Sequence, residues 1–416
     1  MSVVSRAEAV DGVVRGRGLR VLVLVGFAVW FASLVLHWPG RGLLGYSDIY
    51  DGVFVPRFVE RRFWLREWGG SGCPLPYRDY FLEYPPLVGL LWLVSTCVGF
   101  AVSGGDLLAA GVVHYFVSGL FLLVFLVVLV VYLYRLAGVG GWWRVLLFLL
   151  LPSTLFYLVY NWDVVAAALA VAGVYYALRG RLGVSAVLLG LSVEAKLLTF
   201  GVGLWVLGSL YWRGRRREAL LFASVFLAVS AAGFLALLPT GWPWMFLGYH
   251  SGWGCENCIY IPFLRGKFDP LRRVLSIFFT SSVLAYVLLG LRRRPWGGCL
   301  LAASAMAPAL FSYVFTPQMV LLFSSFLLLV LPGRLLPVLL AADAVDAGII
   351  LAVFRDASAG VDPFAWGSLT QALAMLRNLL LLLLLVYCLR GGRVCLSSPA
   401  GRLGGGAWAL RGGLVG

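Results

Sequence analysis

Long apolar runs separated by short clusters of arginine recur along this chain of 416 residues. Hydrophobic residues make up 62% of the chain, charged residues make up 12%, and the mean hydropathy is +0.94. This composition is typical of an integral membrane protein. The net charge of +15 comes from arginines in the turns between the runs, which is the positive-inside pattern and does not indicate a nucleic-acid groove. We therefore predict an all-α, multi-pass protein of the cell membrane with about 10 to 12 transmembrane helices.

The predicted topology has a single transmembrane domain at 20–390 between two cytoplasmic ends. Residues 1–19 carry an excess of arginine and should stay in the cytoplasm. The apolar run that follows is not succeeded by a small-residue cleavage site, so we interpret it as the first anchor. The tail at 391–416 is rich in glycine and arginine and is predicted to be disordered. Two polar loops, at 39–85 and 240–270, then fall outside the cytoplasm.

Three apolar runs need separate interpretation. The run at 86–102 begins with a proline and is at the lower limit of length for crossing, so we predict a juxtamembrane or re-entrant helix. The run at 142–160 is predicted as one spanning segment. The run at 183–212 begins and ends beside cytoplasmic arginines, which requires a hairpin of two half-length helices with its tip near Lys196. Irregular backbone at membrane depth is tolerated only where protein or a wet cavity shelters it.

The longest polar passage, 46–90, is unusually rich in acids. Six of the 18 carboxylates of the chain lie in it: Asp48, Asp51, Glu60, Glu67, Asp79 and Glu83. Polar groups this dense beside a membrane favour a site, although a solvated loop with ion pairs is the simpler interpretation. The topology brings three further clusters to the same face: the Asn-Trp-Asp triplet at 161–163, the hairpin tip at Lys196 and the loop at 249–257.

Acids over a lipid-accessible cavity, with a cation at membrane depth, suit group transfer from a lipid-linked phosphate. A carboxylate can deprotonate an acceptor hydroxyl, and a cation can hold the phosphate as it leaves. No phosphate-cradling glycine loop, HExxH or GxSxG motif is present. The three histidines and seven cysteines show no zinc-ligand spacing, so we predict no metal and no cofactor. Cys255 and Cys258 could form a disulfide or remain free thiols.

Six short motifs follow one another between residues 46 and 320. They are Tyr-Ser-Asp at 46–48, Pro-Tyr-Arg-Asp-Tyr-Phe-Leu-Glu-Tyr-Pro-Pro-Leu at 76–87, Asn-Trp-Asp at 161–163, and the segments 190–196, 249–257 and 316–318. In this order they resemble the GT-C superfamily of multi-pass glycosyltransferases, and they are most similar to its mannosyltransferase-like branch, family 87. The resemblance implies a GT-C-like bundle with juxtamembrane helices in a long first external loop. It also implies transfer of a hexose, with mannose favoured, from a polyprenyl-phosphate sugar to a lipid or glycan acceptor outside the cytoplasm.

The resemblance also assigns roles to residues of this chain. Asp48 occupies the position of the acid that acts at the acceptor, so it is the predicted catalytic carboxylate. Further candidates for the acceptor and donor site are Glu83, Tyr84, Asp163, His250, Glu256 and Gln318. Lys196, a lone lysine at a helix break, and Arg377, inside the last apolar helix, are the candidates for the donor phosphate.

Structural roles are the alternatives for these residues. Asp48, Glu83 and Asp163 could each cap the helix that follows. Lys196 could pair with Glu194. Arg377 could pair with Asp343 or Asp346 on the preceding helix, and we favour this ion pair because Arg377 and Asp343 lie at equal predicted depth.

The alternative function is a transporter or flippase that moves a lipid or polysaccharide without chemistry. Broken helices and intramembrane charges would serve either class of protein. The long acidic loop outside the membrane favours the enzyme, because a transporter does not need it.

Overall fold

The computed structural model describes residues 3–68 and 72–390, and this part of the chain is helical with no named β-strand. Six helices are long and apolar enough to cross a membrane: α1 (Val3–Leu36), α3 (Leu107–Ala137), α9 (Arg216–Ala236), α11 (Leu271–Gly290), α14 (Leu336–Ser358) and α15 (Leu369–Leu389). The shorter α-helices are α2 (Pro86–Val102), α4 (Trp142–Leu149), α5 (Pro152–Tyr157), α6 (Asp163–Leu178), α7 (Leu182–Ala195), α8 (Phe200–Trp212), α10 (Trp242–Gly252), α12 (Gly298–Leu310) and α13 (Leu321–Val330).

Short 3₁₀ turns and a π-helical segment lie between these helices. One π-helical segment, η1 (Asp48–Val59), follows α1. The 3₁₀ turns are η2 (Val139–Gly141), η3 (Leu197–Thr199), η4 (Leu238–Thr240), η5 (Ile261–Phe263), η6 (Pro317–Val320) and η7 (Gly333–Leu335). The fold is thus that of an all-α membrane protein, while the GT-C bundle and the number of spans beyond six stay predictions. The predicted tail at 391–416 lies outside the described residues.

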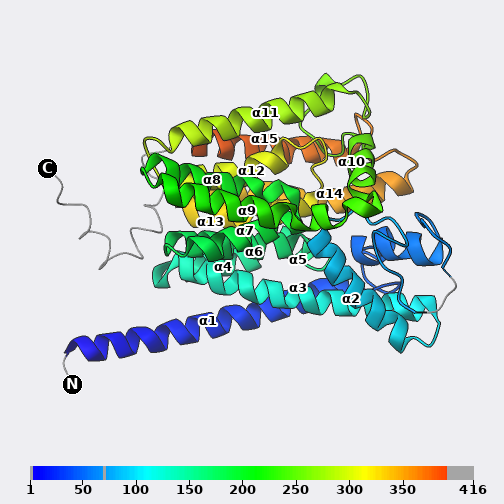
Figure 1. Ribbon diagram of the computed structural model, residues 1–416, viewed down its shortest axis with the longest axis horizontal. Coiled ribbons are helices and arrows are strands. Elements are labelled where there is room, and N and C mark those ends of the chain that lie inside the picture. Colours follow the sequence, from blue (N-terminus) through cyan, green and yellow to red (C-terminus); the bar gives the residue numbers. More distant parts are fainter. Residues whose placement is uncertain (1–2, 69–71, 391–416) are drawn as a thin grey trace.

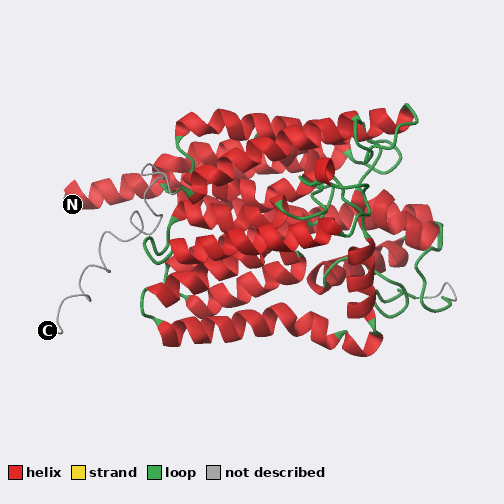
Figure 2. Ribbon diagram, turned by 90° about the horizontal axis from the view of Figure 1, so that it is seen from above, coloured by secondary structure: helices red, strands yellow, loops and turns green. Residues whose placement is uncertain are grey.

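Most helices run side by side along one direction, and the irregular segments gather at one end of the bundle (Figure 1, Figure 2). The short helix α10 and the segment after α1 lie at this end, whereas α1 begins at the other. The polar passages 46–85 and 241–270 therefore meet, although the helices α2 to α9 separate them in sequence.

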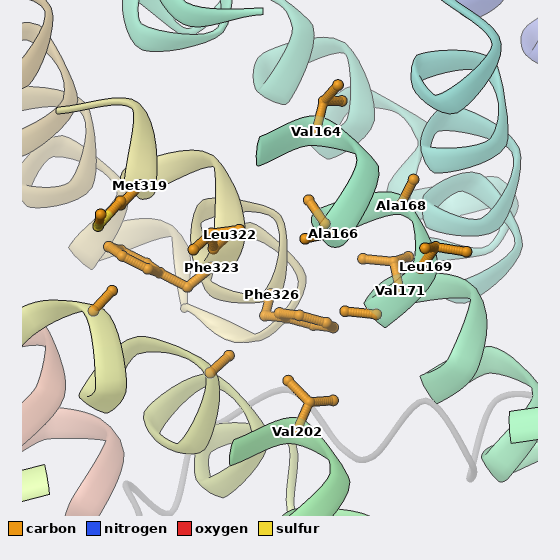
Figure 3. Packing of buried hydrophobic residues seen from close by; sticks show 14 of the residues in the cluster. Val164, Ala166, Ala168, Leu169, Val171, Val202, Met319, Leu322, Phe323 and Phe326 are labelled. Atoms are coloured by element: carbon orange, nitrogen blue, oxygen red, sulfur yellow. The ribbon is translucent and has the colours of Figure 1, made fainter. Parts of the chain in front are cut away.

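The helix α6 forms the centre of the bundle. All its residues except Tyr175 and Tyr176 are buried. Its alanine, glycine and valine side chains are small, which lets neighbouring helices approach closely. A Cβ added at Gly173 would lie 2.6 Å from Cγ of Leu189 on α7. Figure 3 shows side chains of α6 facing those of α8 and α13, including Phe326. This packing fixes the start of α6, where the Asn-Trp-Asp triplet lies.

The predicted hairpin at 183–212 is confirmed as the pair α7 and α8, joined through Lys196 and η3. Lys196 has extended backbone (φ −155°, ψ 113°), which ends α7. At a rise of 1.5 Å per residue each helix is about 20 Å long, short of the ~30 Å hydrocarbon core. Polar side chains bridge the break, because the Ser192 hydroxyl donates to Thr199 Oγ1 (2.9 Å) and Thr199 donates to the Lys196 carbonyl (3.0 Å).

The segment 142–160, predicted to cross the membrane, is not one continuous helix but breaks into α4 and α5. Pro152 begins α5, and Leu151 before it is extended (φ −60°, ψ 132°). A residue before proline is pushed out of the helical region, and proline itself cannot donate to the preceding turn. The Asp343 carboxylate of α14 accepts hydrogen bonds from the Ser153 amide (3.0 Å) and from the Ser153 hydroxyl.

The segment 86–102 forms α2, which is not among the six helices long enough to span. It packs against α3, where the ring centroids of Trp92 and His114 lie 4.2 Å apart. A disulfide between Cys73 and Cys97 joins α2 to the preceding loop. Sequence reasoning did not predict this disulfide. The depth of α2 in the membrane stays a prediction.

Candidate functional site

A cavity of about 830 Å³ opens at the end of the bundle where the irregular segments gather. Residues from η1, the loop before α2, the Asn161 turn and the Lys196 break line one part of it. Residues from α10, the loop at 255–257, α11, the segment 312–319 and α14 line the rest. The four clusters that the topology predicts on one face thus meet around one space.

Asp48 lies in the polar part of this cavity. Its carboxylate accepts hydrogen bonds from Asn161 Nδ2 (2.8 Å), Gln318 Nε2 (3.2 Å) and the Tyr46 hydroxyl (3.3 Å). Its backbone amide donates to the Tyr160 carbonyl (3.1 Å). Within the described part of the chain, Asp48 forms no ion pair. Polar but uncharged groups therefore surround a carboxylate that faces the cavity.

Asp48 is not the cap of η1. Ser47 caps this segment, because its hydroxyl oxygen accepts the Tyr50 amide (3.1 Å). The Ser47 amide in turn donates to the Asp51 carboxylate (2.8 Å). Neighbouring residues thus satisfy the helix start, and the Asp48 side chain remains available to the cavity.

Burial raises the pKa of Asp48 to about 6. Hydrogen bonds from Asn161 and Tyr160 lower this pKa, the positive charge of Lys196 lowers it further, and the nearby Asp163 raises it. A carboxyl group with a pKa near 6 is mostly ionised at neutral pH and still basic enough to accept a proton, which suits a general base.

Lys196 lines the cavity and pairs with Asp163, with 2.9 Å between Nζ and Oδ1. The Lys196 side chain is 16% exposed, whereas that of Asp163 is 2% exposed and does not line the cavity. Asp163 makes no side-chain cap to α6. The alternative pairing of Lys196 with Glu194 is wrong, because Glu194 accepts the Gly233 amide (2.8 Å). Asp163 therefore holds the ammonium at the cavity wall.

Glu83 also lines the cavity, but an arginine neutralises it. Arg57, which is buried, pairs with the Glu83 carboxylate and donates to the carbonyls of Phe81 and Val53 (3.0 Å each). Glu83 does not cap α2, whose first turn has no side-chain cap. Tyr84 accepts a hydrogen bond from Asn161 Nδ2 (3.1 Å), and burial raises the pKa of Tyr84. Sequence reasoning missed Arg57, because its partner is set by tertiary contact.

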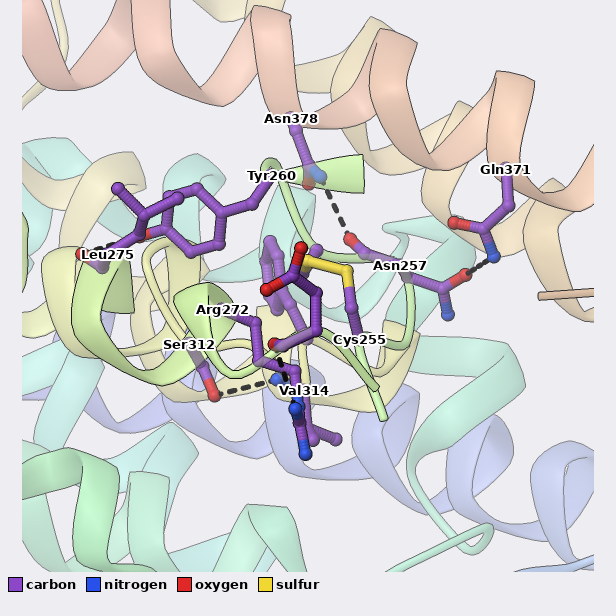
Figure 4. The surroundings of a disulfide bond; sticks show 12 residues. Cys255, Asn257, Tyr260, Arg272, Leu275, Ser312, Val314, Gln371 and Asn378 are labelled. Carbon is purple, nitrogen blue, oxygen red and sulfur yellow. Dashed lines mark hydrogen bonds between the residues drawn. A yellow bond between two sulfur atoms is a disulfide. The ribbon is translucent and has the colours of Figure 1, made fainter. Parts of the chain in front are cut away.

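Glu256 lies on a short loop closed by a disulfide between Cys255 and Cys258 (Figure 4). Its backbone amide donates to the Tyr313 carbonyl (3.0 Å), and its carbonyl accepts the Phe315 amide (2.9 Å). Burial raises the pKa of Glu256 to about 7, a hydrogen bond from Trp253 lowers it, and the charge of Asp48 raises it. The site therefore holds a second carboxyl group that titrates near neutral pH.

His250 lines the cavity from α10. Its Nδ1 lies 2.9 Å from the Phe246 carbonyl, which can only accept, so Nδ1 carries the proton. Burial lowers the pKa of His250 to about 4, and the charge of Lys196 lowers it as well. The neutral imidazole therefore keeps Nε2 as a hydrogen-bond acceptor.

Arg377 does not belong to the cavity, so its candidacy as a phosphate ligand is wrong. It pairs with Asp346 (2.8 Å), and both side chains are 0% exposed. The favoured ion pair is thus confirmed, with Asp346 and not Asp343 as the partner. Arg377 also donates to the carbonyls of Asn257 (3.1 Å) and Phe315 (3.0 Å). Its role is to hold these two segments.

The cavity reaches the outer surface of the bundle at α11. Ser276, Thr280 and Ser281 of this helix line it, and so does Ile277, which is 69% exposed. Further exposed side chains on α11 include the apolar Val274 and Phe278. The opening therefore lies among exposed apolar side chains of a helix that is long and apolar enough to span a membrane.

Comparison with known proteins finds no family model that matches the chain, no curated relative and no solved structure that matches it. The resemblance to GT-C enzymes therefore depends on the six motifs alone.

Proposed function

We propose that the protein is a membrane glycosyltransferase that moves a hexose, with mannose favoured, from a polyprenyl-phosphate sugar to a lipid or glycan acceptor on the extracytoplasmic face. The observation that carries this proposal is the environment of Asp48. Amides and a phenol surround its carboxylate, burial raises its pKa to about 6, and it faces a cavity that also contains the Lys196 ammonium.

In the proposed reaction Asp48 removes the proton of an acceptor hydroxyl. The acceptor oxygen forms a bond to C1 of the hexose as the bond between C1 and the phosphate oxygen breaks, and the polyprenyl phosphate leaves with that electron pair. Negative charge develops on the leaving phosphate, which the Lys196 ammonium would stabilise. Asp163 keeps this ammonium in place, while Asn161 and Gln318 orient the base.

The opening at α11 supports a lipid-linked donor. A polyprenyl chain has to stay in the membrane while its phosphate reaches the site. Apolar side chains of the hairpin tip, Leu197 and Leu198, line the cavity together with Ile277 of α11. They offer an apolar route that ends beside Lys196.

Transfer from defined donors tests the proposal. The purified protein would be reconstituted with radiolabelled polyprenyl-phosphate mannose or polyprenyl-phosphate glucose and a membrane lipid extract as acceptor source. We expect label to move from one donor to a new product while polyprenyl phosphate is released. Movement of the intact labelled donor across the bilayer, with no polyprenyl phosphate released, would instead identify a flippase.

A further inference from the structure

Three rings of α10 and the ring of Trp253, the residue that follows this helix, line the cavity. Phe246, Tyr249, His250 and Trp253 have the spacing i, i+3, i+4 and i+7, which places side chains on the same side of a helix. All four belong to the cavity wall. The ring centroids of Tyr249 and Trp253 lie 5.3 Å apart, and those of His250 and Trp253 lie 5.7 Å apart. The proposed transfer step uses none of them.

This aromatic face carries polar groups at its end. The Trp253 indole donates to Glu256 Oε1 (2.6 Å), so the ring and the carboxyl group form one unit. Glu256 lines the cavity with its remaining acceptor capacity, and His250 adds Nε2 as a further acceptor. An aromatic, apolar surface therefore lies beside several hydrogen-bond acceptors.

Side chains from two other elements fix the end of α10. Arg272, which is buried, donates to the carbonyls of Trp253 (2.9 Å) and Ser251 (3.2 Å). The Tyr313 hydroxyl donates to the His250 carbonyl (2.6 Å). The end of α10 is thus held by two elements that are distant in sequence.

A second set of contacts fixes the disulfide loop. From α15, Gln371 donates to Asn257 Oδ1 (3.1 Å) and Asn378 donates to the Asn257 carbonyl (2.9 Å), as Figure 4 shows. Arg377 donates to the same carbonyl. Asn257 has a left-handed backbone (φ 53°), a conformation that asparagine tolerates better than most residues. So many contacts to one loop indicate that the position of Glu256 matters.

The chemistry of this wall selects one class of ligand. Sugar rings present flat C–H faces that stack on aromatic rings, together with hydroxyl groups that donate to carboxylates and imidazole nitrogens. An alkyl chain would leave these acceptors unpaired, which is costly. On this wall a phosphorylated or acidic ligand would meet the carboxyl group of Glu256, whereas the cavity cation Lys196 lies at the hairpin break and serves the donor phosphate in the proposed reaction.

We propose that the aromatic face of α10 and Glu256 form a binding subsite for a neutral saccharide. The assignment of this saccharide as the acceptor rests on the proposed function. The subsite then narrows the acceptor from a lipid or glycan to the uncharged sugar end of a glycan. Asp48 lines the same cavity, so the acceptor hydroxyl would lie between the stacked ring and this base.

Binding of free oligosaccharides tests the subsite independently of catalysis. The protein in lipid nanodiscs would be titrated with mannotriose and maltotriose, and with an alkyl phosphate and a neutral tripeptide as other ligand classes, using saturation-transfer NMR. We expect at least one trisaccharide to bind, and Trp253→Ala to weaken it about tenfold or more. Trp253→Phe keeps a stacking ring and should retain most of the affinity. Glu256→Gln keeps the shape, still accepts the indole proton, and should weaken binding severalfold.

Trp244→Ala is the matched control, because Trp244 is on the same helix but is 68% exposed and does not line the cavity. It should bind like the wild type. The subsite is overturned if no trisaccharide binds, if only the alkyl phosphate or the peptide binds, or if folded Trp253→Ala and Glu256→Gln both bind the sugar normally. Sugar binding that depends on Trp253 without any transfer would reject the transferase and keep the subsite. Transfer of sugar without binding that depends on Trp253 would keep the transferase and reject the subsite.

Discussion

Two buried ion pairs in this protein have similar geometry and different surroundings. Lys196 and Asp163 lie 2.9 Å apart, and Arg377 and Asp346 lie 2.8 Å apart. Lys196 is at a break between two short helices, and its ammonium borders the cavity. Arg377 is inside a continuous helix, is fully buried and donates from each of its three nitrogens to protein acceptors. An intramembrane cation is thus available to a ligand only where the backbone opens beside a cavity.

The largest expected effect lies on the cavity side of this comparison. Asp48→Asn keeps the shape of the side chain but removes the base, so transfer should fall about 10²–10⁴-fold with normal folding. Asp51→Asn is the control, because Asp51 does not line the cavity and its amide oxygen could still accept the Ser47 amide. The rate of labelled-sugar transfer by each purified variant measures the effect. A rate for Asp48→Asn above about a tenth of wild type would contradict the assignment.

At the fully buried pair of Arg377 and Asp346, loss of one partner should reduce the stability of the fold. Arg377→Met leaves the Asp346 carboxylate and the Phe315 carbonyl without their arginine donor, and should cost about 3–5 kcal/mol of unfolding free energy. Adding Asp346→Leu removes the unpaired charge and should restore part of that stability. Denaturant unfolding of the purified variants measures both values. Normal stability of Arg377→Met combined with a raised donor KM would show that Arg377 binds the donor after all.

Removing the cavity cation should weaken use of the donor, in addition to a folding cost because the buried Asp163 loses its partner. Lys196→Ala loses a charged contact to the phosphate, typically about 1.5–3 kcal/mol, so the donor KM should rise about 10- to 100-fold or transfer should be lost. Lys267→Ala is the control, because Lys267 forms an exposed pair with Asp362 and such pairs contribute little. Unchanged donor kinetics in folded Lys196→Ala would reject the role of Lys196.

The smallest expected effect is a shift in pH dependence. The base must be ionised, so kcat/KM should rise as the pH increases through about 6, the pKa to which burial raises Asp48. The Lys196 charge lowers the pKa of Asp48, and the charge of Asp163 raises it. Any residual activity of Lys196→Ala should therefore show its acidic limb at higher pH than the wild type. Rates measured across a pH range that brackets 6 would show it. A limb at the same pH in both proteins would mean that Lys196 and Asp48 are not coupled.

Local patterns determined the framework of this protein. Hydropathy and the arginine turns predicted an all-α membrane protein, and two arginine-flanked ends predicted the α7–α8 hairpin with its break at Lys196. These predictions succeed because membrane insertion depends on the composition of contiguous segments. Apolar composition did not show the break inside 142–160, where Pro152 divides the segment into α4 and α5.

Only tertiary structure decided which side chains meet. Asn161 and Gln318 donate to Asp48 from 113 and 270 residues away. Equal predicted depth favoured Asp343 as the partner of Arg377, but packing turns Asp343 toward Ser153 and Asp346 toward the arginine. These two aspartates are within one helical turn of each other, so no local pattern separates them. The choice depends on how α14 and α15 are rotated against their neighbours, and only the packed bundle specifies that rotation.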